Sequence, residues 1–153
     1  MVASDETRER VNDVDNVDDE LVAVARNAME RAYAPYSGFL VGAALRAADG
    51  RVFDGCNVEN ASFPVGVCAE RVAIGHAVVS GARDFRRLVV ASSGSRPASP
   101  CGMCRQALAE FGLDLEIVSV TSDGRRARWL LADLLPADFR LAEVLAGGDE
   151  GPR

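Results

Sequence analysis

The sequence has no apolar run that approaches the roughly 18 residues of a membrane span, and its start lacks the hydrophobic stretch of a signal peptide. Basic residues are also few, because 17 Lys and Arg stand against 23 Asp and Glu, for a formal net charge of −6. Such a balance repels polyanions, since nucleic-acid affinity is built mainly on Lys and Arg. We therefore expect a cytoplasmic protein with neither a membrane nor a nucleic-acid partner.

Histidine is the scarcest of the usual metal ligands. His76 is the only one in the chain, and it lies six residues beyond Glu70 in a helical pattern. That spacing turns it well away from the Glu70 carboxylate. A lone helical histidine is more often a packed or surface residue than a ligand, so we leave His76 out of the predicted site.

The size and composition fit one folded domain. A chain of 153 residues falls within the range of roughly 100 to 200 residues that a single core commonly serves. Hydrophobic residues make up 48% and charged residues 26%, which is too little charge for general disorder. The acidic segment 1–17 and the glycine-rich segment 147–153 look like flexible tails without chemistry. We expect one catalytic domain over residues 18–146.

Hydrophobic periodicity predicts that helices and strands alternate. Helical patterns cover residues 18–34, 68–79, 103–111 and 132–146, and strand-like runs cover residues 39–47, 52–58, 88–91, 115–120 and 127–131. Asp49-Gly50 is a hairpin dipeptide, so the first two strands should be antiparallel, and helical crossovers should join the later strands. Gly81 and Gly112 mark helix exits, and a turn is expected at 122–124. This order predicts an α/β fold with a mixed sheet.

The cysteines carry the strongest chemical signal. Clustered thiols in a reducing compartment are more often metal ligands than disulfides. Ser99 and Pro100 suit the start of a helix, which places Cys101 and Cys104 one turn apart on one side of its positive end. Cys68 begins another predicted helix and offers a third thiolate. The three thiolates predict a zinc site.

Three protein ligands leave one corner of a tetrahedral zinc ion for water, which is typical of catalytic rather than structural zinc. The segments CAE at 68–70 and PCGMC at 100–104 match the pattern of zinc deaminases, in which the Glu acts as general acid and base. Glu70 has that position here. In one alternative Cys56 closes the site as a fourth ligand, and in another the thiols form disulfides. We interpret Cys56 instead as a small buried strand residue.

Four longer segments resemble the small homotetrameric cytidine deaminases in content and order: YAPYSGFLVGAAL, GCNVENASFP, CAERVAIGHAVVSG and SPCGMCRQALAEFG. LLPADF is similar to the C-terminal element of that family. The resemblance covers residues 33–139 and leaves the acidic N-terminal extension outside it. It implies a three-layer α/β/α sandwich with a five-stranded mixed sheet, one Zn²⁺ per subunit, and a homotetramer whose active sites receive residues from neighbouring subunits.

The resemblance also implies roles for single residues. Asn57 and Glu59 correspond to ribose-binding residues, and Phe39 to the aromatic residue that packs against the base. An amide and a carboxylate at alternate strand positions point to one face, so both reach a sugar hydroxyl while Val58 should face the other way. Arg71 resembles a partner that donates hydrogen bonds to thiolates and offsets their negative charge.

These features together predict a hydrolase that deaminates cytidine and deoxycytidine to uridine and deoxyuridine, with release of ammonia, in pyrimidine salvage. Glu70 should take a proton from a zinc-activated water and return protons to ring N3 and to the leaving amine. The backbone near Ala69 and Ser99 should hold the polar edge of the ring. Phe63 stands where many relatives carry Tyr, so any hydrogen bond from that hydroxyl is missing.

Three other functions fit parts of the pattern. A deaminase for a modified nucleoside such as blasticidin S shares the C-x-E and PCGxCRQ elements, although NVEN and SGFLVGAAL favour cytidine. A polynucleotide editor shares the zinc motif but needs a basic surface. A structural zinc module needs a fourth ligand and no accessible carboxylate, so Glu70 distinguishes it from an enzyme.

Overall fold

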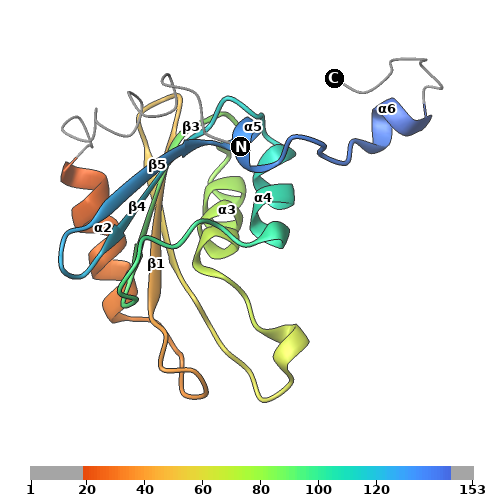
Figure 1. Cartoon of the computed structure of the whole chain (residues 1–153). Coiled ribbons are helices and arrows are strands. Elements are labelled where there is room, and N and C mark those ends of the chain that lie inside the picture. The colour runs from red at the N-terminus through yellow and green to blue at the C-terminus, as the bar shows by residue number, and fades with distance from the viewer. Residues whose placement is uncertain (1–18, 146–153) are drawn as a thin grey trace, which may run out of the picture.

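The computed structural model describes residues 19–145, and the two expected tails, 1–17 and 147–153, lie outside the described residues. A five-stranded mixed sheet with the order β2-β1-β3-β4-β5 forms the centre. Helix α2 (Asp19–Glu30) covers one face of the sheet, and α3 (Ala69–Val79) and α4 (Gly102–Ala109) cover the other (Figure 1). This arrangement is the predicted three-layer α/β/α sandwich.

The sheet combines three antiparallel strand pairs, β1–β2, β1–β3 and β4–β5, with one parallel pair, β3–β4. Its strands are β1 (Val41–Ala47), β2 (Val52–Cys56), β3 (Phe85–Ser92), β4 (Glu116–Thr121) and β5 (Arg126–Leu130). The β1–β2 hairpin is antiparallel as predicted, and Gly50 has the positive φ of 89° that its turn requires. Strands β3 and β4 are parallel and joined through α4, but β5 pairs antiparallel with β4. The expectation of a helical crossover is therefore wrong for β5, because the turn at 122–124 reverses the chain directly.

Two apolar layers enclose the sheet. The layer beneath α2 contains the fully buried side chains Leu21, Ala25, Val89, Val118 and Val120. The layer beneath α3 and α4 is larger, and it contains Leu45, Ala73, Leu88, Leu108 and Ile117. The buried residues of α2 follow the predicted helical stripe, although the helix ends at Glu30 rather than near residue 34.

Two glycines let the helices lie directly on the strands. A Cβ on Gly42 would lie 2.0 Å from the carbonyl oxygen of Ala25 in α2. A Cβ on Gly55 would lie 2.5 Å from the carbonyl oxygen of Ala69, in the first turn of α3. Backbone atoms cannot yield to such a contact, so glycine is required at both positions. The close approach at Gly55 sets the depth of the α3 N-terminus above the sheet.

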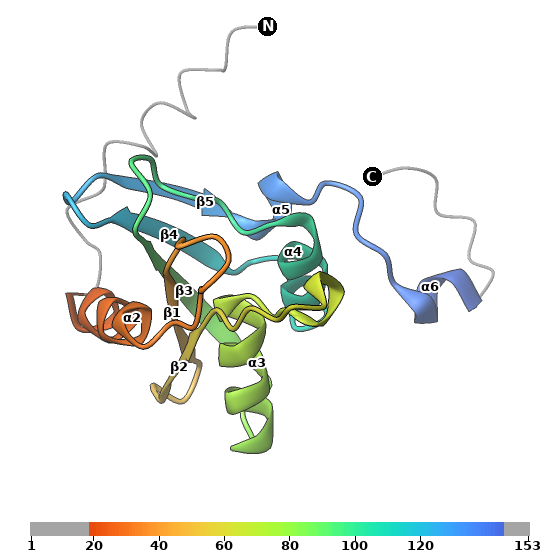
Figure 2. The same cartoon turned by 90° about the horizontal axis from the view of Figure 1, so that it is seen from below.

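The C-terminal region differs from the single helix predicted over 132–146. It forms two short helices, α5 (Leu131–Leu134) and α6 (Leu141–Leu145), with Pro136 in the segment between them. Proline lacks an amide hydrogen and restricts the residue before it, so one continuous helix cannot form here. Figure 2 shows that α6 stands away from the body of the domain. No helix within residues 19–145 is long and apolar enough to cross a membrane.

Candidate active site

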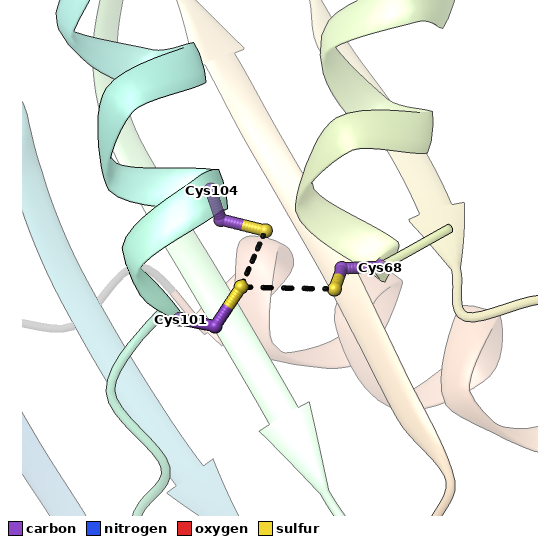
Figure 3. Close-up of side chains that lie close together, drawn as sticks. All are labelled: Cys68, Cys101 and Cys104. Atoms are coloured by element: carbon purple, nitrogen blue, oxygen red, sulfur yellow. Dashed lines mark hydrogen bonds between the residues drawn. The ribbon is translucent and has the colours of Figure 1, made fainter. Parts of the chain in front are cut away.

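Three cysteine sulfur atoms converge where the N-termini of α3 and α4 meet. The Sγ atoms of Cys68 and Cys101 are 3.9 Å apart, and those of Cys101 and Cys104 are 3.6 Å apart (Figure 3). All three ligand atoms lie within 4.8 Å of one another. The structure thus brings together the three predicted metal ligands, from segments more than 30 residues apart in the sequence.

The thiols at the N-termini of α3 and α4 point to the cluster and do not cap their own helices. Cys68 is the N-cap of α3 and Cys101 the N-cap of α4, and neither side chain forms a capping hydrogen bond. Cys104 lies one turn into α4 and is fully buried. The positive ends of two helix dipoles therefore face the sulfur cluster, which favours thiolates.

The hydrogen bond between Cys68 and Cys104 shifts the pKa values of the two thiols in opposite directions. The hydrogen bond with Cys104, helped by the nearby guanidinium of Arg71, lowers the pKa of Cys68 to about 5, against the opposite effect of burial. The same bond to Cys68, together with burial, raises the pKa of Cys104. One thiolate is already favoured at neutral pH, and a cation must replace the remaining protons to gather all three thiolates.

The cluster fits a zinc ion. With Zn–S bonds of about 2.3 Å, tetrahedral geometry places sulfur ligands about 3.8 Å apart. The observed Sγ–Sγ separations of 3.6 and 3.9 Å are close to this value. All four cysteines of the chain are free, so the disulfide alternative is wrong. Cys56 is outside the cluster, half-buried rather than buried at the end of β2, and its Sγ contacts the carbonyl of Arg31 at 3.6 Å. Its position does not support the alternative of a fourth ligand.

Glu70 shares one small cavity with two of these thiols. The cavity has a volume of about 280 Å³, and its lining includes Cys68, Glu70 and Cys101. The Glu70 side chain is 5% exposed. Burial, followed by the charge of Cys68, raises the pKa of this carboxyl group. A buried carboxyl group therefore faces the same space as the sulfur cluster, with its proton affinity increased.

The other predicted contact residues also line the cavity: Phe39, Asn57, Glu59, Ala69 and Ser99. The Asn57 amide is held by the backbone, since Oδ1 accepts a hydrogen bond from Val41 and Nδ2 donates to Phe39, both at 2.8 Å. Val58 also lines the cavity. Strand β2 ends at Cys56, two residues earlier than predicted, and Val58 then forms isolated β-bridges with Tyr33 and Val67. The direction of the Val58 side chain stays a prediction.

Glu59 anchors the loop before β1. Its carboxylate accepts hydrogen bonds from the backbone N–H groups of Tyr36 and Ser37, at 2.8 and 3.2 Å, and from the Ser37 hydroxyl. The Ser37 hydroxyl contributes most to lowering the pKa of Glu59. The carboxylate is thus ionised and pointed at the cavity rim. Sequence reasoning did not find Ser37, although it lies within the quoted segment YAPYSGF.

Three further residues that the sequence analysis singled out, Arg71, Phe63 and His76, do not line the cavity. Arg71 donates to the carbonyl of Gly66 at 3.2 Å and lies close to Cys68. Phe63 is 77% exposed and packs edge-on against Tyr36, with ring centroids 5.9 Å apart. His76 faces Asp54 at 3.2 Å and does not line the cavity, as predicted.

The chain is similar to known proteins in both sequence and structure. The model of the cytidine and deoxycytidylate deaminase zinc-binding region matches residues 15–120. A cytidine deaminase of Sporosarcina psychrophila is 44% identical over 122 residues, covering 79% of this chain and 90% of that protein.

The chain belongs to the cytidine deaminase family.

Solved cytidine deaminases share the fold as well. The crystal structure of cytidine deaminase from Burkholderia pseudomallei superposes with a TM-score of 0.77 and 44% identity, covering 80% of this chain and 99% of that one. A blasticidin-S deaminase of Bacillus cereus is more distant, at 31% identity over 128 residues and 78% of this chain and 90% of that protein. Membership of the cytidine deaminase family identifies the chain as a hydrolytic enzyme, and the sulfur cluster fits the zinc ion of that family.

Proposed function

We propose that this cytidine deaminase hydrolyses cytidine and deoxycytidine to uridine and deoxyuridine, releasing ammonia, as a step of pyrimidine salvage in the cytoplasm. One observation carries the proposal: two thiols of the three-cysteine cluster, Cys68 and Cys101, line one nucleoside-scale cavity together with the buried carboxyl group of Glu70. The sequence relatives named cytidine deaminase support the choice of substrate. The reaction adds one water molecule across C4 of the ring and expels the amine.

The metal belongs to Cys68, Cys101 and Cys104, one ion per subunit. Zn²⁺ held there supplies a Lewis acid that makes a water molecule acidic enough to attack at neutral pH. Arg71 acts beside the cluster, where its guanidinium offsets the negative charge of three thiolates. The helix N-termini of α3 and α4 contribute in the same direction.

Glu70 moves the protons of the reaction. Its carboxylate accepts a proton from the attacking water and delivers it to ring N3, and a second proton then passes to the amine that leaves as ammonia. Because burial raises its pKa, the carboxylate is a stronger base than an exposed glutamate.

The remaining cavity residues hold the nucleoside. Phe39 is 40% exposed at the rim and packs against the base, while the backbone of Ala69 and Ser99 holds the polar edge of the ring. Asn57 and Glu59 bind the sugar hydroxyls. The Glu59 carboxylate already accepts hydrogen bonds from the 36–37 loop. Its side chain is therefore held in place before the sugar binds, and binding costs little conformational entropy at this residue.

Exposed large apolar side chains support a homotetramer. Phe63, Met103 and Phe139 are 77%, 63% and 60% exposed, and exposed apolar patches of this kind mark protein interfaces. An assembly that covers them completes the open side of each cavity with residues from neighbouring subunits. The catalytic domain extends over residues 18–146 in this proposal.

The test follows the ultraviolet absorbance change as the cytosine ring loses its amine. Purified protein receives cytidine, deoxycytidine and blasticidin S in parallel, with and without a zinc chelator. We expect turnover of cytidine and deoxycytidine, which the chelator should abolish and added Zn²⁺ should restore. Activity on blasticidin S alone would replace the substrate assignment, and zinc-loaded protein that leaves all three amines intact would overturn the function. Sedimentation equilibrium measures the tetramer separately.

A further inference from the structure

Arg105 makes an unusual set of contacts on the far side of the cavity wall. Its Nε donates to the carbonyl of Pro100 at 2.7 Å, and one terminal nitrogen donates to the Ser99 hydroxyl at 3.0 Å. The other terminal nitrogen donates to the carbonyl of Leu134, the last residue of α5, at 2.9 Å. One guanidinium group therefore ties three points of the chain together.

The segment that Arg105 holds is part of the site. Ser99 and Cys101 line the cavity, whereas Arg105 is not among the lining residues. The backbone N–H of Arg105 also donates to the carbonyl of Cys101 at 3.0 Å. The side chain and backbone of Arg105 thus fasten the whole stretch 99–101, which leads into the N-cap cysteine of α4.

We infer that Arg105 is a positioning residue, whose guanidinium fixes the 99–101 wall so that Cys101 and the backbone of Ser99 keep their places relative to Glu70. The inference rests on the proposed function for its kinetic part. The N-cap backbone of Cys101 is extended, so rotation there swings the thiol without unwinding α4. Without the three hydrogen bonds, the wall has local freedom and the thiol spends less time at the metal position.

Lysine cannot replace this arrangement. The three N–H donors of a lysine ammonium group all belong to one nitrogen atom at the end of a flexible chain. The planar guanidinium instead directs N–H groups on three nitrogen atoms to three separate acceptors. Arg105→Lys therefore keeps the positive charge and loses the geometry, which makes it the informative variant. Arg105→Met removes both.

Arg51 offers a matched control. It also donates to a backbone carbonyl, that of Ser80 at 2.8 Å, and to a side chain, Asp49, but it lies on the β1–β2 hairpin away from the cavity. Gln106→Ala offers a second comparison. Gln106 holds the backbone of Phe139 through two hydrogen bonds, at 2.9 and 3.0 Å, and so anchors the C-terminal segment without touching the 99–101 wall.

The experiment measures zinc affinity by competition with a chromophoric chelator, the absorption spectrum of the Co²⁺-loaded protein, and kcat and KM for cytidine. We expect Arg105→Lys to lose zinc affinity or kcat by about 10- to 100-fold, to alter the Co²⁺ thiolate bands, and to lower kcat in larger proportion than it raises KM. Ser99→Ala, which removes one of the three bonds, should show a smaller change in the same direction. Arg51→Met should change stability only.

Unaltered zinc affinity, Co²⁺ spectrum and kcat in folded Arg105→Lys would overturn the inference, even with a lowered Tm. The same loss of zinc affinity in Gln106→Ala would also overturn it, since the C-terminal anchor would then be responsible. Should Arg105→Met not fold, Arg105→Lys and Ser99→Ala decide the question. Wild-type protein is assayed alongside, so an inactive wild type refutes the proposed function while the zinc and Co²⁺ measurements still test Arg105.

Discussion

Replacing Glu70 by glutamine separates the proton carrier from every other part of the site. The two side chains have the same number of heavy atoms, so the 5% exposed position keeps its packing. The buried carboxyl group already has a raised pKa, which means that the folded protein disfavours the charge that glutamine removes. Folding and zinc content should therefore be preserved in Glu70→Gln.

Turnover should fall steeply because the amide cannot accept or pass on a proton. A positioned general acid–base group contributes about 10²- to 10⁴-fold in rate, which corresponds to about 2.7 to 5.4 kcal/mol of barrier. Both proton transfers of the proposed reaction depend on this one carboxylate. The loss should therefore lie toward the upper end of that range, in kcat rather than in KM.

The assay compares Glu70→Gln with Glu110→Gln, a change of the same type at the exposed C-cap of α4. Initial rates of cytidine loss, zinc per chain by elemental analysis, and Tm are measured for both variants and for wild type. Glu110→Gln should match wild type in all three. A fully zinc-loaded Glu70→Gln enzyme that retains kcat within about tenfold of wild type would refute the proton-carrier role.

Three further predictions address the ligands, the fold and the loop anchor. Cys101→Ala should lose zinc together with activity, whereas Cys56→Ala should retain full zinc stoichiometry, and zinc retained in the first variant or lost in the second would contradict the ligand set. Gly55→Ala should destabilise the protein by about 1–3 kcal/mol or more, since its Cβ would overlap the α3 backbone. Gly75→Ala has open space around the new Cβ and should stabilise the protein by about 0.5–1 kcal/mol. Equal Tm values for the two variants would count against the close approach at Gly55. Hydrogen bonds lower the pKa of Glu59 below 4.5, so the loop contact is present above that pH and is lost only as the pH falls through the lower folded-state value. The KM of the wild type should then show no titration of Glu59 from about pH 5 to 9, whereas Glu59→Gln should raise KM across that range, and an unchanged KM in this variant would exclude the role.

The positions of α2, α3 and α4 and the presence of a thiol at each end of the cluster were predictable because their signals are local. The apolar stripe of α2 follows from a 3.6-residue period, and the ends of α3 and α4 follow from the residues that start helices. Ligand spacing within one turn then places Cys101 beside Cys104. The pairing of these thiols with Cys68 followed from a motif match and was confirmed by the sulfur separations.

Other features required the folded chain. Pro136 signalled a break, yet a helical pattern on both sides of it suggested one helix over 132–146. The antiparallel pairing of β5 depends on a turn whose alternatives differ little in sequence. Strand β2 ends at Cys56, two residues before its predicted end, because the ends of elements are the least certain part of a prediction from sequence.

By itself the sequence determined the order of helices and strands, the three thiols with their carboxyl partner, and the family to which the chain belongs, because each depends on residues that are close in the chain or on a fixed motif. Only the tertiary structure decided which groups those residues meet. The clamp of Arg105 on Ser99, Pro100 and Leu134 joins segments up to 29 residues apart, and the anchor of Glu59 on the 36–37 loop spans more than 20. Such contacts are set by how helices pack on the sheet, and no periodicity or spacing along the chain encodes them.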